Sequence, residues 1–169
     1  MRRNLLPVLA LLTSTLFLFL GNGLQGLLLP VRGSLEGYSN EILGLIGTTW
    51  ATCFVATNLV RRIGHVRAFA GFGALICLNV LLTGILVDQT AWLILRAVTG
   101  FCTAGTCMII ESWLNERATN ESRGAIFSFY ISITLFGVVG GQMMVPFVDI
   151  STPILFMICG ILYCLAIIP

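Results

Sequence analysis

Residues 5–29 read LLPVLALLTSTLFLFLGNGLQGLLL and contain no charged side chain. A helix rises about 1.5 Å per residue, so a run of about 20 apolar residues spans the hydrocarbon core of a bilayer. This run is longer than the apolar region of a secretory signal peptide, and no small-x-small cleavage site ends it. It therefore predicts a retained membrane-spanning helix, which Pro30 is expected to close.

The composition of the whole chain has the same character. Apolar residues make up 57% of the 169 residues and charged residues 9%. A soluble domain carries about 25% charged residues, which it needs to cover a surface that faces water. The composition therefore excludes a soluble enzyme, a nucleic-acid-binding module and a disordered tail, and it makes membrane lipid the main surroundings of the fold.

Six apolar segments predict an all-α fold, an integral membrane six-helix bundle that forms one domain over residues 1–169. The predicted spans are residues 5–29, 41–60, 68–87, 91–115, 124–148 and 153–168. The sixth span is short for a crossing, and no charged residue follows it. We therefore expect the chain to be a fragment, or a natural half-length product, of a longer protein.

The arginines predict the direction in which the spans cross. All nine basic residues are arginine, and eight of them lie outside the spans. If both termini are cytoplasmic, Arg32 is the single external arginine and the others are internal, as the positive-inside rule requires. This distribution predicts a multi-pass protein of the plasma (inner) membrane with both termini in the cytoplasm.

Helical periodicity places polar side chains on one face of three spans. These stripes contain Asn22 and Gln25 on the first span, Arg96 and Glu111 on the fourth, and Gln142 on the fifth. Such stripes are typical of a bundle around a hydrated path, so these five residues are the candidate substrate or coupling residues. The third and sixth spans have few polar side chains and suit positions against lipid.

Arg96 is the strongest single indication of function, because a cation in hydrocarbon costs at least about 2.5 kcal/mol on insertion scales. It either faces a cavity, where it meets a substrate anion or tunes a proton-carrying group, or extends its side chain to the outer surface. Glu111 either pairs with a loop arginine, Arg117 or Arg123, or takes part in gating or coupling. The three amide side chains either face the cavity or join helices through hydrogen bonds.

Small residues predict where helices approach one another closely. One seam of small residues, on the fifth span, contains Gly137, Gly140 and Gly141, and another, on the second span, contains Gly44, Thr48 and Ala51. Gly100 on the fourth span is a further predicted helix-packing position. The six cysteines form no C-x-x-C pair and lie far from the lone His65, so neither a metal site nor another cofactor is predicted.

Several of these features resemble the N-terminal half of a major facilitator superfamily transporter. Residues 62–67, RIGHVR, are similar to the R-x-G-x-x-R loop signature, and residues 96–104 to the fourth-helix pattern R-x-x-x-G-x-x-x-A. Three further segments resemble the YcaD-like branch of that superfamily: residues 111–114, 122–124 and 141–142. The loop departs from its signature at Thr57 and Arg61, where a glycine and an acidic residue are usual.

The resemblance implies a secondary active transporter that moves a small polar or drug-like solute by alternating access. It implies a cytoplasmic gating loop at Arg61, Arg62, Gly64 and Arg67, and a partner that is either a missing C-terminal half or a second copy of this chain. The alternative is a non-transporting membrane assembly partner or a degenerate half-transporter. An enzyme is not expected, because no nucleophile and base meet at one depth. Sugars, amino acids, drugs and organic acids are all compatible substrates, by symport or antiport.

The predicted orientation depends on the loop arginines. Replacing Arg61, Arg62 and Arg67 together by glutamate is expected to disturb the topology, because it reverses the charge that holds this loop in the cytoplasm. Thiol labelling of single cysteines from each side of the membrane measures the sidedness. Unchanged sidedness in the triple variant would contradict the prediction.

Overall fold

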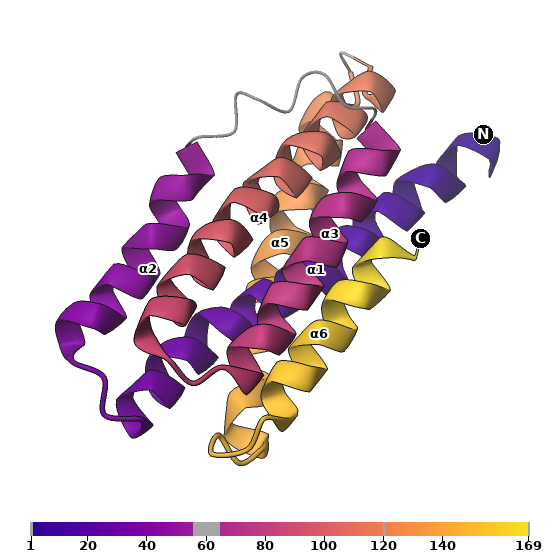
Figure 1. Cartoon of the computed structure of the whole chain (residues 1–169). Helices are drawn as coiled ribbons and strands as arrows, with labels where there is room; N and C mark the ends of the chain where they lie inside the picture. The colour runs from indigo at the N-terminus through magenta and orange to yellow at the C-terminus, as the bar shows by residue number, and fades with distance from the viewer. Residues whose placement is uncertain (1, 56–64, 120, 169) are drawn as a thin grey trace.

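The computed structural model describes residues 2–55, 65–119 and 121–168. Within these ranges every regular element is helical (Figure 1). The elements are α1 (Arg2–Leu35), α2 (Asn40–Val55), α3 (His65–Ile85), α4 (Gln89–Arg117), α5 (Arg123–Met144), the short 3-10 helix η2 (Val145–Phe147) and α6 (Ile154–Ile167).

The six predicted spans coincide with these α-helices, although residues 56–60 of the second span lie outside the described residues. Four helices are long and apolar enough to cross a membrane, over Leu9–Leu35, Arg67–Ile85, Gln89–Arg117 and Arg123–Phe147. The short sixth segment is confirmed as well, because α6 has 14 residues. The chain is thus an all-helical protein with several helices suited to a bilayer.

The expectation that Pro30 closes the first helix is wrong, because α1 continues to Leu35. A proline removes one N–H donor from the helix. Leaving the helix in apolar surroundings would leave many more backbone groups unpaired, so the helix persists. It ends instead at Gly37, whose φ of 78° is a left-handed conformation that favours glycine. The Tyr38 N–H then bonds to the Gly33 carbonyl at 2.9 Å and closes the last turn.

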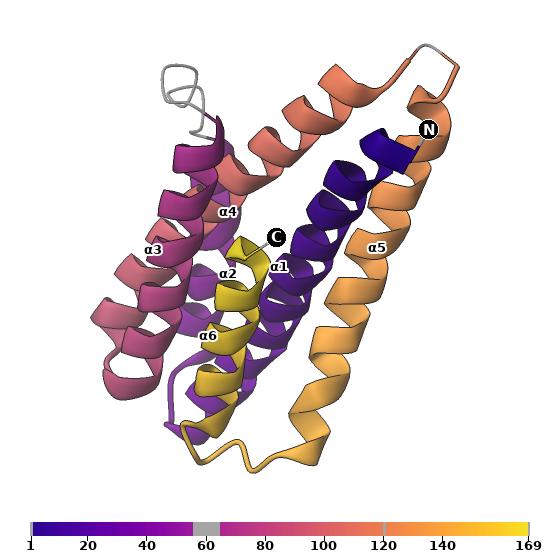
Figure 2. The same ribbon diagram turned by 90° about the vertical axis from the view of Figure 1, so that its right-hand side faces the viewer.

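The helices pair as two matching sets of three. In one set α1 packs against α5 and α6, in the other α4 packs against α2 and α3, and α3 packs against α6. Exchanging α1, α2 and α3 for α4, α5 and α6 reproduces these pairs, and the views in Figures 1 and 2 agree with them. The triples α1–α3 and α4–α6 thus form two repeats, and because each repeat holds three consecutive helices, the two repeats run through the bundle in opposite directions, as inverted repeats do.

The two ends of the bundle carry different connections. The N-terminus and the α4–α5 connection lie at one end, which we call the proximal end (Figure 2). The α1–α2, α3–α4 and α5–α6 connections lie at the other end, the distal end. The arginine distribution predicts that the proximal end faces the cytoplasm.

Glycines allow the backbones of α1 and α5 to touch. A Cβ atom on Gly23 would lie 2.1 Å from the carbonyl oxygen of Val138, and one on Gly141 would lie 2.1 Å from that of Leu20. Gly137 and Gly140 also face α1, with the nearest atoms to an added Cβ at 2.8 and 3.0 Å. The two helices therefore form a closely packed pair that excludes larger side chains at their crossing.

The pair formed by α4 and α2 has the same construction. A Cβ atom on Gly100 would lie 2.4 Å from the carbonyl oxygen of Trp50. The small residues Gly44, Thr48 and Ala51 of α2, in contrast, are exposed, and an added Cβ on Gly44 would meet nothing within 4 Å. The small-residue seam of α2 thus faces away from the described part of this chain.

A substitution at the α1–α5 crossing tests this packing. Gly141→Ala is expected to lower the free energy of unfolding by about 1–3 kcal/mol, because the new methyl group collides with backbone that cannot move aside. Unfolding of the purified protein by sodium dodecyl sulfate in mixed micelles measures the change. The matched control is Gly26→Ala on α1, where an added Cβ has open space. Equal stability of the two variants would contradict the close crossing.

Candidate functional site

Polar side chains from three helices meet inside the bundle. Gln25 comes from α1, Arg96 from α4 and Tyr163 from α6, and all three are buried. The Tyr163 hydroxyl donates a long hydrogen bond of 3.4 Å to Oε1 of Gln25. The Arg96 guanidinium lies within electrostatic range of Tyr163 and of Cys159 on α6. We call these four residues, with Trp50 of α2, the central cluster.

Tyr163 lies against α1 because residues one helical turn apart on α6 face residues one helical turn apart on α1. Gly21 and Gln25 are one turn apart on α1, and Cys159 and Tyr163 are one turn apart on α6. Cys159 Sγ donates to the Gly21 carbonyl at 3.1 Å, and an added Cβ on Gly21 would lie 3.0 Å from the Tyr163 ring. The absence of a side chain at Gly21 therefore lets the tyrosine ring lie flat against α1.

The Arg96 side chain is enclosed and carries a charge without a counter-charge. Its Cζ atom lies 5.7 Å from the centre of the Trp50 ring, a cation–π distance. Its Nε and Nη1 atoms are buried and have no hydrogen-bond partner. Among the described residues, one ion pair is formed, and it joins Arg32 to Glu36. No described carboxylate therefore pairs with Arg96.

The depth of Trp50 decides between two interpretations of Arg96. Counted from the distal end, Arg96 lies about 10 Å along α4 and Trp50 about 15 Å along α2. A side chain that extended to the distal surface would point away from Trp50, yet only 8% of Arg96 is exposed and its guanidinium lies over that ring. The side chain is therefore turned into the bundle. The contact follows from the α2–α4 crossing, since Gly100, one turn from Arg96, touches the Trp50 backbone.

The sequence did not single out Tyr163 and Cys159, because it placed the sixth span against lipid. One face of α6 is buried at Phe156, Cys159 and Tyr163, whereas Met157 and Ile161 are exposed. Lipid and protein interior are both apolar, so the two faces of such a helix carry the same kind of residue. The signal that was present is a hydroxyl and a thiol spaced by four residues.

The remaining candidate residues lie outside the central cluster. Asn22 is half-buried on α1, and Gln142 is exposed on α5. Glu111 is exposed near the proximal end of α4, where it accepts a hydrogen bond of 3.3 Å from the Tyr130 hydroxyl. Arg123 donates to Asn115, from Nε at 2.9 Å, and not to Glu111.

The predicted gating loop falls mostly outside the described residues. Arg61, Arg62 and Gly64 belong to residues 56–64, which the structure does not describe. Arg67 is exposed in the first turn of α3. The structure therefore places one residue of that loop at the proximal surface.

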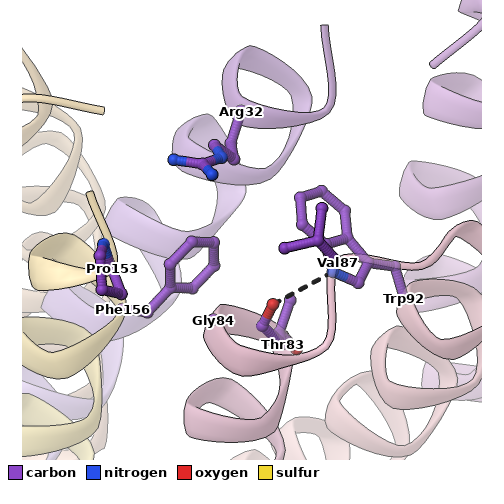
Figure 3. Close-up of a pocket in the computed structure, with 7 residues that line it drawn as sticks. All are labelled: Arg32, Thr83, Gly84, Val87, Trp92, Pro153 and Phe156. Carbon is purple, nitrogen blue, oxygen red and sulfur yellow. Dashed lines mark hydrogen bonds between the residues drawn. The ribbon is translucent and has the colours of Figure 1, made fainter. Parts of the chain in front are cut away.

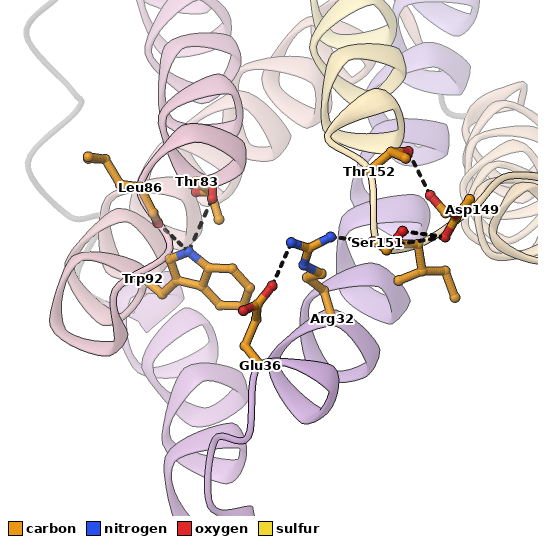
Figure 4. A network of polar contacts seen from close by, with 9 residues as sticks. Arg32, Glu36, Thr83, Leu86, Trp92, Asp149, Ser151 and Thr152 are labelled. Carbon is orange, nitrogen blue, oxygen red and sulfur yellow. Dashed lines mark hydrogen bonds and ion pairs between the residues drawn. The ribbon is translucent and has the colours of Figure 1, made fainter.

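A second polar network holds the distal end together (Figure 4). Arg32 donates from Nη1 to the Ile150 carbonyl at 2.8 Å, and its Nη2 lies 2.5 Å from Glu36. In the same connection, the side chain and backbone of Ser151 bond to Asp149 and hold the pKa of that carboxyl below its usual value. The predicted external arginine is thus occupied in tying α1 to the α5–α6 connection.

Trp92 joins four segments of the distal end. Its Nε1 donates to the carbonyls of Leu86, at 2.7 Å, and Thr83, at 3.1 Å, which are among the last acceptors of α3. Its ring packs edge-on against Tyr38, with centres 5.2 Å apart, and against Phe156 at 6.3 Å. Trp92 therefore connects the ends of α3 and α6 with the α1–α2 connection and the start of α4.

A small pocket lies beside Trp92 and Arg32 (Figure 3). Its volume is about 60 Å³, which is enough for a few water molecules. The other lining residues are Thr83, Gly84, Val87, Pro153 and Phe156. The pocket belongs to the distal network, and its size does not suit a solute.

Metal chemistry and known relatives give no further assignment. In the part of the chain that the structure describes, no three His, Cys, Asp or Glu side chains converge on a metal position. No protein-family model matches the chain, and no curated protein matches it. The features of the molecule that bear on function are therefore the central cluster and the pairing of the helices.

The two Trp92 hydrogen bonds can be tested by one substitution. Trp92→Phe is expected to lower the free energy of unfolding by about 1–3 kcal/mol, because two carbonyls lose their donor while the ring remains apolar. Thermal unfolding of the purified protein measures the loss. Trp113→Phe serves as the control, since Trp113 is partly buried in the core. A control variant that is destabilised as strongly would contradict the role of the Trp92 N–H.

Proposed function

We propose that this chain is one half of a secondary active transporter, which moves a small polar solute across the membrane by alternating access. The observation that carries the proposal is a buried arginine with N–H groups that no protein atom accepts. An uncompensated charge at this depth is costly, so ionisable residues in such positions usually serve a substrate or ion path. Arg96 and Gln25 are then the substrate-facing residues.

The position of the cluster within the fold supports this proposal. Gln25 and Arg96 come from α1 and α4, the first helices of the two inverted repeats, α1–α3 and α4–α6. Transporters built from inverted repeats bind their substrate where the repeats meet, near mid-membrane. The resemblance to the major facilitator superfamily, which we include in the proposal, implies a substrate between this half and a second six-helix half, with α1 and α4 lining the path and the proximal end in the cytoplasm.

The packing also supports a route for movement. The α1–α5 and α2–α4 pairs are closely packed through glycines, whereas α1 and α4 make few contacts with each other. In the proposed transporter each pair moves as a rigid unit, and rocking of this half against the second wall opens the cluster to one side or the other. Solute binding shifts the balance between these two states.

The proposed complete transporter needs a second wall, formed by a C-terminal half or a second copy of this chain. Only 17% of the apolar window of α5 is buried, and Phe129, Phe136 and Phe147 are exposed. The amide of Gln142 and the small-residue seam of α2 are exposed as well. An amide in hydrocarbon lacks hydrogen-bond partners, which favours protein over lipid against this face.

The alternative function is that of a membrane assembly partner that does not transport. The exposed length of α5 favours it, since such a surface suits docking of another membrane protein. In a partner of this kind the central cluster stays closed to water on both sides, whereas in a transporter it opens to each side in turn. Access of water to the cluster therefore separates the two functions.

A thiol-accessibility experiment makes this comparison. Thr103 lies two turns from Arg96 on the same face of α4 and is 1% exposed. In a cysteine-free background, Thr103→Cys is expected to react with a membrane-impermeant thiol reagent in both right-side-out and inside-out vesicles. Ile76→Cys, in the α3 core, is the matched control and is expected to stay unreactive. If Thr103→Cys stays unreactive in one or both vesicle orientations, alternating access is refuted.

A further inference from the structure

We infer that the solute held at the central cluster is a small organic monocarboxylate, whose carboxylate binds the Arg96 guanidinium. The inference rests on the proposed transport function and names its substrate class. It starts from the charge balance of the site, which the chain itself leaves incomplete.

No acidic residue of the chain is placed to neutralise Arg96. The seven are Glu36, Glu41, Asp88, Glu111, Glu116, Glu121 and Asp149. Glu36 pairs with Arg32, Asp88 caps α4 through the Ala91 N–H, and Asp149 binds Ser151. Glu111 lies about 22 Å from Arg96 along α4, and the remaining three are exposed. An arginine stays protonated under all ordinary conditions, so the missing charge has to come from an anion outside the chain.

The number of cations in the cluster limits the charge of that anion. Arg96 is the single cationic side chain of the central cluster, so a monoanion makes the occupied site neutral. A dianion such as a phosphate monoester would leave a net negative charge in a low-dielectric interior, which is strongly unfavourable. A carboxylate carries the matching charge, and its two oxygens fit the planar fork of a guanidinium.

The surroundings of the guanidinium define the rest of the ligand. The Trp50 ring lies over the guanidinium, which leaves the N–H groups at its edges for hydrogen bonds. The neighbouring groups are the Tyr163 ring and the Cys159 thiol, both buried. These neighbours suit a small apolar or aromatic body attached to the carboxylate, and neither is a cation that could pair with a second negative charge.

Binding of benzoate compared with benzamide tests the inference directly. The two probes share a ring and differ in charge, and the full chain is placed in nanodiscs of phosphatidylcholine, which has no net charge. Benzoate is expected to bind saturably, with a change in tryptophan fluorescence and a rise in Tm, whereas benzamide and chloride are not. Oleate forms a second arm, which separates a carboxylate drawn from the membrane from one drawn from water.

Variants assign the binding to Arg96. Arg96→Gln is expected to weaken benzoate binding by about 10- to 100-fold, because it removes a charge-assisted hydrogen-bonded pair. Arg96→Lys keeps the charge and is expected to fall between the two. Arg117→Gln, at an exposed position on the same helix, is expected to bind as the unaltered chain does. If Arg96→Gln does not fold, the benzoate–benzamide comparison on the unaltered chain and the Arg96→Lys variant still carry the test.

The outcomes separate this inference from the proposed function. Equal binding of benzamide, competition by chloride at equal concentration, or unchanged benzoate binding by Arg96→Gln would each overturn the carboxylate assignment. Binding of oleate but not of benzoate would overturn the small solute and leave a lipid carboxylate from the membrane as the ligand. If the carboxylate assignment fails while Thr103→Cys still reacts from both sides, the transport proposal still holds. Carboxylate binding without that reactivity overturns transport and leaves the binding site.

Discussion

The polar groups inside the bundle are governed by one constraint, which is that apolar surroundings offer no hydrogen-bond partners. The constraint keeps α1 helical through Pro30. It explains why the Trp92 N–H donates to the Leu86 carbonyl at the end of α3. It also explains the buried threonines: the hydroxyls of Thr15, Thr83 and Thr99 each donate to the carbonyl four residues before. These hydroxyls therefore satisfy their hydrogen-bonding capacity within their own helices. Arg96 cannot satisfy its N–H groups in this way, and its buried Nε and Nη1 have no hydrogen-bond partner.

Much of the architecture could be predicted from the sequence, because length and hydrophobicity alone determine where a helix crosses a bilayer. The stripes that contain Gln25 and Arg96 were identifiable since amides and charges stand out against apolar neighbours. Tyr163 and Cys159 were not identifiable as site residues, because a helix between lipid and protein shows no contrast between its two faces. The partner of Glu111 could not be predicted either, since Tyr130 reaches it from α5 only through the tertiary fold.

The helix pairing adds information that no single span contains. Gly23 on α1 and Gly100 on α4 occupy matching places, each against the backbone of the second helix of the other repeat. The central cluster lies between these two crossings, so its geometry depends on both. A change in the spacing of the pairs would therefore keep the contact between Trp50 and Arg96, which lie in one pair, and change their distance from Gln25 on α1.

The unbalanced charge of Arg96 has an electrical consequence. A single positive charge that shifts within a membrane field exchanges about 2.3 kcal/mol with a potential of 100 mV, in proportion to the fraction of the field it crosses. In the proposed transporter a bound monoanion makes the moving unit neutral, and the voltage acts on it only weakly. The proposal therefore implies that the membrane potential biases the resetting of the vacant carrier and leaves the loaded step nearly unaffected, a difference that transient capacitive currents record.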